Sequence, residues 1–318
     1  MAIAATVKSS RTISGGKLKS TLRYINKKKY LYILIIPCLI YFFVFNYIPM
    51  YGIIIAFKDF NFAKGILGSK WIGLENFKYM FGLSDFYQVF WNSLYLSFLR
   101  LVFGFPFPIL LALLLNEMRS EIYKKITQTV IYLPHFISWV IIGGILANFL
   151  SPTWGMVNII IKSMGCEPIY FLAKTEYFRP IVIITSIWKE SGWGTIIYLA
   201  AIAGINVEIY EAAVMDGANR LQRLWYITLP CIKSTIIILL VLRLGQIMGN
   251  GFEQIFVLQN PKNLSVSEVF ETYTYRVGIL GGRFSFGTTV GLFTSVIGMI
   301  FLLLSNKAAR MLGEEGIW

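Results

Sequence analysis

The sequence EAAVMDGANRLQRLWYITLP, residues 211–230, carries acidic and then basic residues between two long apolar segments. Asn206, just before it, is a candidate N-cap, and the acids Glu208 and Glu211 fall in the first turns, where a helix favours negative charge. Gly217 suits the C-terminal stop of that helix. The pattern therefore predicts a short helix over about residues 207–216.

A second helix is predicted directly after this stop, with Asn219 as its cap. Pro230 has no backbone N–H, so it should end this helix before the next apolar segment. Apolar residues recur at i, i+3, i+4 and i+7 and form one face, from which Arg220 and Arg223 turn away. That face consists of Leu221, Leu224, Trp225 and Thr228. From these residues alone, an amphipathic helix that merely anchors a loop at the membrane surface is an equal alternative.

The composition of the chain is that of an integral membrane protein. Of the 318 residues, 56% are hydrophobic and only 14% are charged, and the mean hydropathy is +0.65. These values exclude an ordinary soluble domain. A membrane-spanning helix needs about 20 mostly apolar residues, and the predicted fold class is therefore all-α, a polytopic membrane protein with six transmembrane helices. The six stretches lie near residues 31–57, 89–115, 126–150, 180–204, 232–257 and 287–306.

The distribution of Lys and Arg along the chain indicates membrane topology more than nucleic-acid binding. The net charge is +13, but the first 29 residues alone hold eight Lys and Arg and no acid. The N-terminal tail, the loops at 116–125 and 205–233 and the C-terminal tail hold 8, 3, 3 and 2 Lys and Arg, against 4, 3 and 3 in the alternate loops. The excess of positive charge predicts that both termini and residues 211–230 are cytoplasmic.

Polar residues interrupt the fifth stretch at helical spacing. Polar groups at membrane depth are costly and usually face a protein interior or a water-filled path. Four of them fall at i, i+3, i+7 and i+10 and would share one face of a continuous helix: Arg243, Gln246, Asn250 and Glu253. This face either lines a transport path or forms a polar seam between helices. Ser93, Ser97 and Arg100 show a weaker version in the second stretch, where packing is an equal alternative.

The fourth stretch carries Lys189 and Glu190 between Trp188 and Trp193. Adjacent side chains on a helix point about 100° apart, so this pair is not one simple ion pair. Sugars present hydroxyls to polar side chains and apolar ring faces to aromatic rings, so the group suits a carbohydrate. An aromatic belt at the membrane interface explains the tryptophans equally well.

Other reactive residues form no recognisable site. His135 is the single histidine, so we expect it to be structural. Residues 15–18, GGKL, lack the pattern of a phosphate-binding loop. We therefore expect that the chain is not an enzyme and binds no nucleic acid, metal or cofactor of its own. The three cysteines have no metal or redox spacing, and we expect them to be packing residues: Cys38, Cys166 and Cys231.

Residues 211–230 resemble the EAA loop of permease subunits in binding-protein-dependent ABC importers. The matching positions are Glu211, Ala212, Ala213, Gly217, Ile227, Leu229 and Pro230. Three further stretches and the last residue are similar to carbohydrate-type permeases, in particular those for oligosaccharides and polysaccharide fragments: YIPMYG at 47–52, YLPHFIS at 132–138, IWKESGW at 187–193, and Trp318. The resemblance extends over nearly the whole chain.

The resemblance implies a type I ABC importer permease fold. Residues 30–318 would form the transmembrane permease domain, after a cytoplasmic basic tail at 1–29, with a cytoplasmic coupling loop at about 206–230. In such importers this loop seats in a groove of an ATPase, where Glu211 is expected to meet a basic residue. The residues implied in coupling are Glu211, Ala212, Ala213, Asp216, Gly217, Leu229 and Pro230. Those expected along the substrate path are Trp188, Lys189, Glu190, Trp193, Arg243, Gln246, Asn250 and Glu253.

The implied partners are two cytoplasmic ATPases that carry ATP and Mg, a second homologous permease, and an extracytoplasmic solute-binding protein that docks on residues 151–179 and 258–286. The chain would then form half of the path for a carbohydrate, an oligosaccharide, across a bacterial cell membrane. The alternative is a secondary transporter or channel that needs no ATPase. That class should show inverted repeats or broken helices with ion sites, and no repeat is detectable.

Overall fold

The computed structural model describes residues 24, 27–311, 313 and 316–317, so most of the basic tail at 1–29 and the terminal Trp318 lie outside the described residues. The chain divides into two compact units, Met1–Ile54 and Ile55–Trp318. In the first unit, α2 (Lys29–Phe42) continues through a π-helical turn, η1 (Phe43–Tyr47), into α3 (Ile48–Met50). A 3-10 segment, η2 (Tyr51–Phe57), follows. The helix Lys29–Phe57 is long and apolar enough to cross a membrane, as predicted for the first stretch.

The second unit opens with a small hairpin. Strand β1 (Lys58–Asp59) pairs antiparallel with β2 (Lys70–Trp71), with Lys58 opposite Trp71. The short helix α4 (Gly65–Gly68) lies between the two strands, and α5 (Glu75–Phe81) follows them. This hairpin is the sheet of the described residues, and everything after it is helical or loop.

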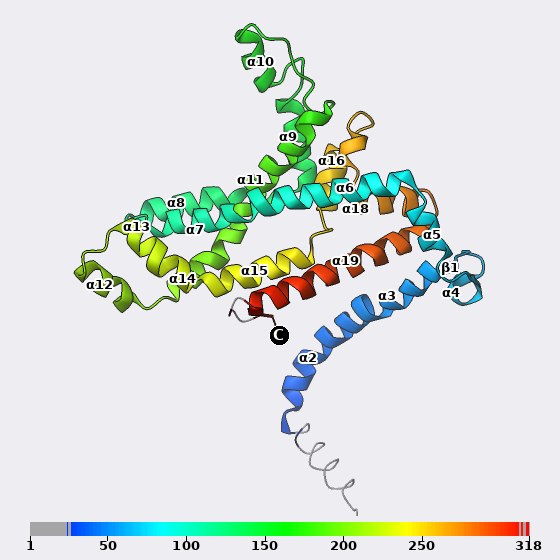
Figure 1. Ribbon diagram of the computed structural model, residues 1–318, viewed down its shortest axis with the longest axis horizontal. Helices are drawn as coiled ribbons and strands as arrows, with labels where there is room; N and C mark the ends of the chain where they lie inside the picture. Colours follow the sequence, from blue (N-terminus) through cyan, green and yellow to red (C-terminus); the bar gives the residue numbers. More distant parts are fainter. Residues whose placement is uncertain (1–23, 25–26, 312, 314–315, 318) are drawn as a thin grey trace, which may run out of the picture. The chain divides into compact units, whose positions relative to one another are not determined.

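Two helices of the second unit can each cross a membrane alone. The first runs from Ser84 to Asn116 as α6 (Ser84–Leu99), η3 (Arg100–Gly104) and α7 (Pro106–Asn116). The second is α19 (Phe284–Met311). Figure 1 shows α15 and α19 running side by side, and their residues are in contact. Both helices match the second and sixth predicted stretches.

The other three predicted spans are bent pairs of helices. The chain turns by 98° between Glu121–Phe136 and α9, by 70° between α11 and α12, and by 58° between Arg220–Cys231 and α15. Counting each pair as one span gives up to six spans in the described part of the chain. The elements are α8 (Glu121–Tyr132), η4 (Leu133–Phe136), α9 (Trp139–Phe149), α11 (Thr175–Ala203), α12 (Val207–Met215), α13 (Arg220–Arg223), η5 (Leu224–Thr228), α14 (Leu229–Cys231) and α15 (Lys233–Gly245).

Short helices connect these spans on the side where α9 and α11 meet. One of them, α10, extends beyond α9 and away from the row of α6, α7, α15 and α19 (Figure 1). The connecting elements are α10 (Met156–Ser163), α16 (Phe252–Leu258), α17 (Leu264–Ser267), α18 (Phe270–Tyr273) and η6 (Thr274–Leu280).

Three of the π-helical turns precede a proline by two residues. They end at Tyr47, Gly104 and Thr228, before Pro49, Pro106 and Pro230 respectively. A proline in a helix lacks the N–H for the carbonyl four residues earlier and its ring collides with that carbonyl. In all three cases this carbonyl lies inside the wide turn, where the collision is relieved without ending the helix. Pro230 therefore widens its helix, which ends at Cys231.

The fifth predicted span, near 232–257, is not one helix, and this corrects the sequence expectation. Helix α15 ends at Gly245, and the chain resumes as α16 only at Phe252. Gly251 has φ +74°, a left-handed conformation that a side chain would strain, and it makes the break possible. Arg243, Gln246, Asn250 and Glu253 consequently do not share a helical face: Gln246 and Glu253 are exposed, whereas Asn250 is buried.

Asn250 fastens this break to the second span. The side chain is fully buried, its Oδ1 accepts from Ser97 Oγ at 3.0 Å, and its Nδ2 donates to the Ser93 carbonyl at 3.1 Å. Its backbone N–H donates to Glu271 Oε1 at 2.8 Å. Ser93 Oγ in turn accepts from the backbone N–H of Phe270 at 3.0 Å. The spacing of Ser93 and Ser97 thus serves a buried polar seam between helices, one of the two interpretations of the sequence.

Three apolar clusters complete the packing of the second unit. The first joins α5, α6, α18 and α19 around Phe86 and Phe270. The second joins α6, α11 and α16 around Phe178 and Ile255. The third joins α7 and α11 to Ile232, at the start of the fifth span. Because helices in a membrane associate through close packing, these clusters fix the spans that carry the polar residues described below.

Replacing Asn250 by alanine should lower the free energy of unfolding by about 1–3 kcal/mol, because two buried interhelical hydrogen bonds are lost and their partners stay buried. Unfolding of the purified protein in detergent by added SDS measures the change. Asn148→Ala is the control, since that exposed side chain bonds only the carbonyl of Gly144 on its own helix, and the expected change is within about 0.5 kcal/mol. Equal losses in both variants would contradict the role of Asn250.

Candidate transport path and coupling loop

The first helix of the coupling loop has the predicted caps. Helix α12 covers Val207–Met215, and Asn206 Oδ1 accepts from the backbone N–H of Glu208 at 3.0 Å. Gly217 has φ +80°, its N–H bonds the Val214 carbonyl at 3.0 Å, and the N–H of Ala218 bonds the Ala213 carbonyl at 2.8 Å. This pair of bonds around a left-handed glycine is a Schellman stop. The helix is therefore a short rigid unit closed at both ends.

The second helix is capped as predicted, but its faces differ from the prediction. Asn219 and Gln222 form a reciprocal capping box, with bonds of 2.8 and 2.9 Å. Leu221 and Trp225 are 68% and 64% exposed, whereas Arg223 is half-buried and its Nε is buried without a partner. The wide turn η5 changes the number of residues per turn, so the predicted 3.6-residue face is not maintained.

A hydrogen bond ties the two helices of the loop together. The hydroxyls of Tyr210 on α12 and Thr228 on η5 lie 2.8 Å apart, and Thr228 is buried. The outer surface of α12 is open: Glu211 and Ala212 are exposed, and Met215 is 87% exposed. An exposed apolar and acidic surface on a helix held at both ends is suited to contact with another protein.

Lys189 serves the bend of the third span and does not reach the cavity described below. Its side chain is 8% exposed, and its Nζ donates to the His135 carbonyl at 2.6 Å, at the end of η4. The ring of Trp139, on the far side of the bend, lies 5.6 Å from the same Nζ. The His135 ring stacks on Trp193, with 4.8 Å between centroids and 6° between planes. His135 thus packs beside the bend of the third span.

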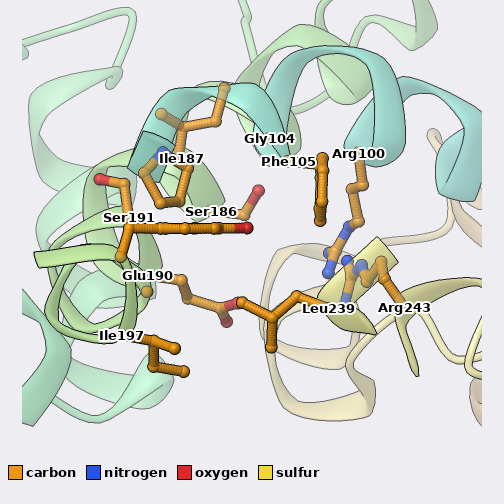
Figure 2. A pocket seen from close by; sticks show the side chains of 13 residues that line it. Arg100, Gly104, Phe105, Ser186, Ile187, Glu190, Ser191, Ile197, Leu239 and Arg243 are labelled. Carbon is orange, nitrogen blue, oxygen red and sulfur yellow. The ribbon is translucent and has the colours of Figure 1, made fainter. Parts of the chain in front are cut away.

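Glu190 points away from Lys189, as the helical geometry predicted. It faces a cavity of about 230 Å³ between η3, α7, α11 and α15 (Figure 2). The other charged residues there are Arg100, on the first residue of η3, and Arg243, in the last turn of α15. The remaining walls are largely apolar and include Phe105, Ile187 and Leu239, with Ser186 and Ser191.

Arg100 is held in place by a residue that sequence reasoning missed. The Arg100 side chain is 6% exposed, and its Nη2 donates to Gln254 Oε1 at 2.5 Å. Gln254 is itself buried, and its Nε2 donates to the Val182 carbonyl at 2.8 Å and to Thr185 Oγ1 at 2.9 Å. The chain break at Gly251 places Gln254, in place of Glu253, toward the core. A continuous-helix reading of the sequence gave no signal for this.

The residues predicted for the substrate path separate into several places. Glu190 and Arg243 meet at the cavity, and Arg100 joins them. Trp188 lines a separate apolar groove between α7, α8 and α11, and Gln246 lines another cavity beside α19. Among the residues that the structure describes, no group of three or more His, Cys, Asp or Glu could hold a metal ion.

Comparison with known proteins identifies the family. The profile of the binding-protein-dependent transport system inner membrane component family matches residues 104–313. This family is a transport permease component and not an enzyme. The match includes the bent spans, the coupling loop and two of the three charged residues of the cavity, Glu190 and Arg243, whereas Arg100 lies four residues before the matched range.

Two relatives and one solved structure cover almost the whole chain. Protein LplB of Bacillus subtilis (strain 168) is 46% identical over 306 residues, 96% of each chain. The polygalacturonan/rhamnogalacturonan transport system permease protein YteP of the same organism is 48% identical over 302 residues, 95% of this chain and 94% of its own. A chain of a bacterial alginate ABC transporter, solved with its alginate pentasaccharide-bound periplasmic protein, superimposes with a TM-score of 0.85 at 43% identity, covering 93% of this chain and 99% of that chain.

These matches confirm the resemblance drawn from the EAA loop and the all-α type I permease fold. A permease of this kind is an inner membrane component of an ABC importer. The chain therefore belongs to the family of binding-protein-dependent transport system inner membrane components.

Proposed function

We propose that this chain is one of two homologous permease subunits of an ATP-driven importer, and that it forms half of the path by which an oligosaccharide crosses a bacterial cell membrane. The observation that carries the proposal is α12, a short helix capped at both ends with an open acidic and apolar surface, in a chain 43% identical to a subunit of a solved importer. The substrate is a carbohydrate larger than a monosaccharide. Relatives named for polygalacturonan, rhamnogalacturonan and alginate support a fragment of an acidic polysaccharide.

Coupling to ATP hydrolysis runs through the loop at 206–230. Helix α12 seats in a groove of a cytoplasmic ATPase, and Glu211 meets a basic residue there. Ala212 and Ala213 permit close approach, and Gly217 permits the turn. The hydroxyl bond between Tyr210 and Thr228 carries the movement into η5 and α14, which contain Leu229 and Pro230. Two such ATPases, each with ATP and Mg, complete the importer.

Both termini and the coupling loop face the cytoplasm, which places residues 151–179 and 258–286 outside to meet a solute-binding protein. The second of these segments is stiffened by an ion pair: Arg276 Nε and Nη2 donate to the two Glu268 oxygens at 2.6 and 2.8 Å. The hydrogen bonds to Glu268 raise the pKa of Arg276. In the first segment, Asn158 is buried and bonds three carbonyls of the chain around it, which gives α10 a fixed position.

Glu211→Lys should release the ATPases while the chain still inserts in the membrane, because the change reverses the charge on an exposed docking surface and touches no span. Gentle-detergent purification followed by mass spectrometry of the bound subunits measures the loss, and ATP-dependent uptake should be abolished. Glu121→Lys, an exposed acid in the first turn of α8, is the control and should retain both. ATPases retained by the Glu211 variant, or a chain purified alone in the wild type, would contradict the proposal and favour a transporter that needs no ATPase.

Gly217→Val should reduce both ATPase retention and uptake, about tenfold or more, because the left-handed φ strains any β-branched residue by about 1–3 kcal/mol and distorts the stop of α12. Gly73→Val is matched to it. That glycine also has a left-handed φ, of +60°, and open space around the position of a Cβ, but it lies between β2 and α5. A similar loss of uptake in both variants would show that general strain, and not the coupling loop, is responsible.

A further inference from the structure

We propose that Arg100 and Arg243 form a carboxylate-binding site that receives the acid group of a sugar unit during transport, with Glu190 as the opposing charge that keeps the binding weak enough for release. The inference rests on the proposed function, because it names what an oligosaccharide must carry to use this cavity. It assigns the site to three residues from three different helices, η3, α11 and α15.

The cavity carries an excess of unpartnered positive charge. Charged side chains inside a membrane protein are costly unless they are paired or line a path. Among the described residues, neither arginine has a carboxylate oxygen within 4 Å, and the hydrogen-bond partner of Arg100 is the neutral amide of Gln254. Arg100 Nε is buried without a partner. Two guanidinium groups therefore offer free donors at one cavity.

The geometry suits a carboxylate. In Figure 2 the guanidinium groups of Arg100 and Arg243 lie next to each other at one end of the cavity, and the Glu190 side chain extends toward them from the opposite wall. The charges of Glu190 and Arg243, and that of Glu271 outside the cavity lining, are close enough to act on Arg100. A guanidinium presents parallel N–H donors that match the two oxygens of a carboxylate. Gln254, itself bonded to α11, holds Arg100 in place.

The size and walls of the cavity fit one sugar unit. Its volume of about 230 Å³ lies below the range of roughly 300–1,000 Å³ that is usual for pockets enclosing a whole ligand. Phe105, Ile187 and Leu239 supply apolar surface on which a sugar ring can lie, while Ser186 and Ser191 are near for its hydroxyls. A chain of sugars would thus pass this site one unit at a time.

Glu190 explains how a bound acid leaves. A transport site must bind well enough to admit its substrate and weakly enough to release it. The opposing carboxylate reduces the net charge of the cavity from two positive to one. Glu190 lies on α11, the helix that precedes the coupling loop, and Arg243 lies on α15, the helix that follows it. Movement of the loop therefore changes the distance between the two charges, and with it the affinity for an anion.

The binding test uses the complete importer, purified with its partner subunits and placed in lipid nanodiscs. Phenylglyoxal modifies accessible arginines, and mass spectrometry reports the modification of Arg243. Trigalacturonate should slow this modification about tenfold, whereas the trimethyl ester of the same sugar, equal in length but uncharged, should not. Equal modification with and without trigalacturonate, or equal protection by acid and ester, would overturn the site.

The transport test compares the same two sugars in proteoliposomes that contain the importer and its binding protein. Arg243→Gln should lower kcat/KM for trigalacturonate about 10- to 100-fold, because the sugar carboxylate then loses one of its two guanidinium partners, and Arg243→Lys should recover part of it. Lys125→Gln, which removes an exposed charge from α8, should match the wild type. Glu190→Gln should lower both KM and kcat for the acid, because the anion binds more tightly and leaves more slowly.

The outcomes separate this inference from the proposed function. If ATP drives uptake of oligosaccharides but Arg243→Gln affects acid and ester equally, the importer stands and the carboxylate site is wrong. If no oligosaccharide is taken up with ATP by the wild type, the proposed function fails. Arg243 is the residue of choice because Arg100 is buried and bonded to the core, so that Arg100 variants confound binding with folding.

Discussion

The whole fold depends on how backbone groups are satisfied where a membrane helix bends or breaks. Inside a bilayer an unpaired N–H or C=O has no water to bond, so each irregularity requires a partner from the protein. The chain meets this need in three ways. Wide turns precede Pro49, Pro106 and Pro230. Lys189 bonds the His135 carbonyl at the bend of the third span. Glu271 Oε1 accepts from the backbone N–H of Asn250 at the break of the fifth.

Local signals in the sequence were sufficient for elements that are stabilised locally. Asn206, Gly217 and Asn219 were each identified as caps, because a cap depends on residues two or three positions away. The span positions also followed from length and hydropathy. The break after Gly245 was not predicted, because it is stabilised by hydrogen bonds between Asn250 and the distant partners Ser93, Ser97 and Glu271.

The same distinction applies to the candidate site. Glu190 and Arg243 were identified because charges stand out in apolar stretches, but Lys189 stood out equally and serves a bend. Arg100 was noticed only as part of a weaker pattern, and Gln254 not at all, since an uncharged residue on an irregular segment leaves no periodic trace. The role of a charged side chain inside a membrane protein depends on which groups of other helices it contacts. Those contacts are set by the tertiary structure.

The wide turn η3 sets the angle between the packed faces of α6 and α7. An α-helix advances about 100° per residue, and a wide turn accommodates an extra residue within one turn. The faces of α6 and α7 are therefore offset in phase, and each packs against its own neighbours: α6 against α16 and α18, α7 against α11. Restoring an ordinary turn would rotate one face against the other. The number of residues between the two packed faces is thus as constrained as the identity of those residues. Pro106, the first residue of α7, stands where this number is fixed.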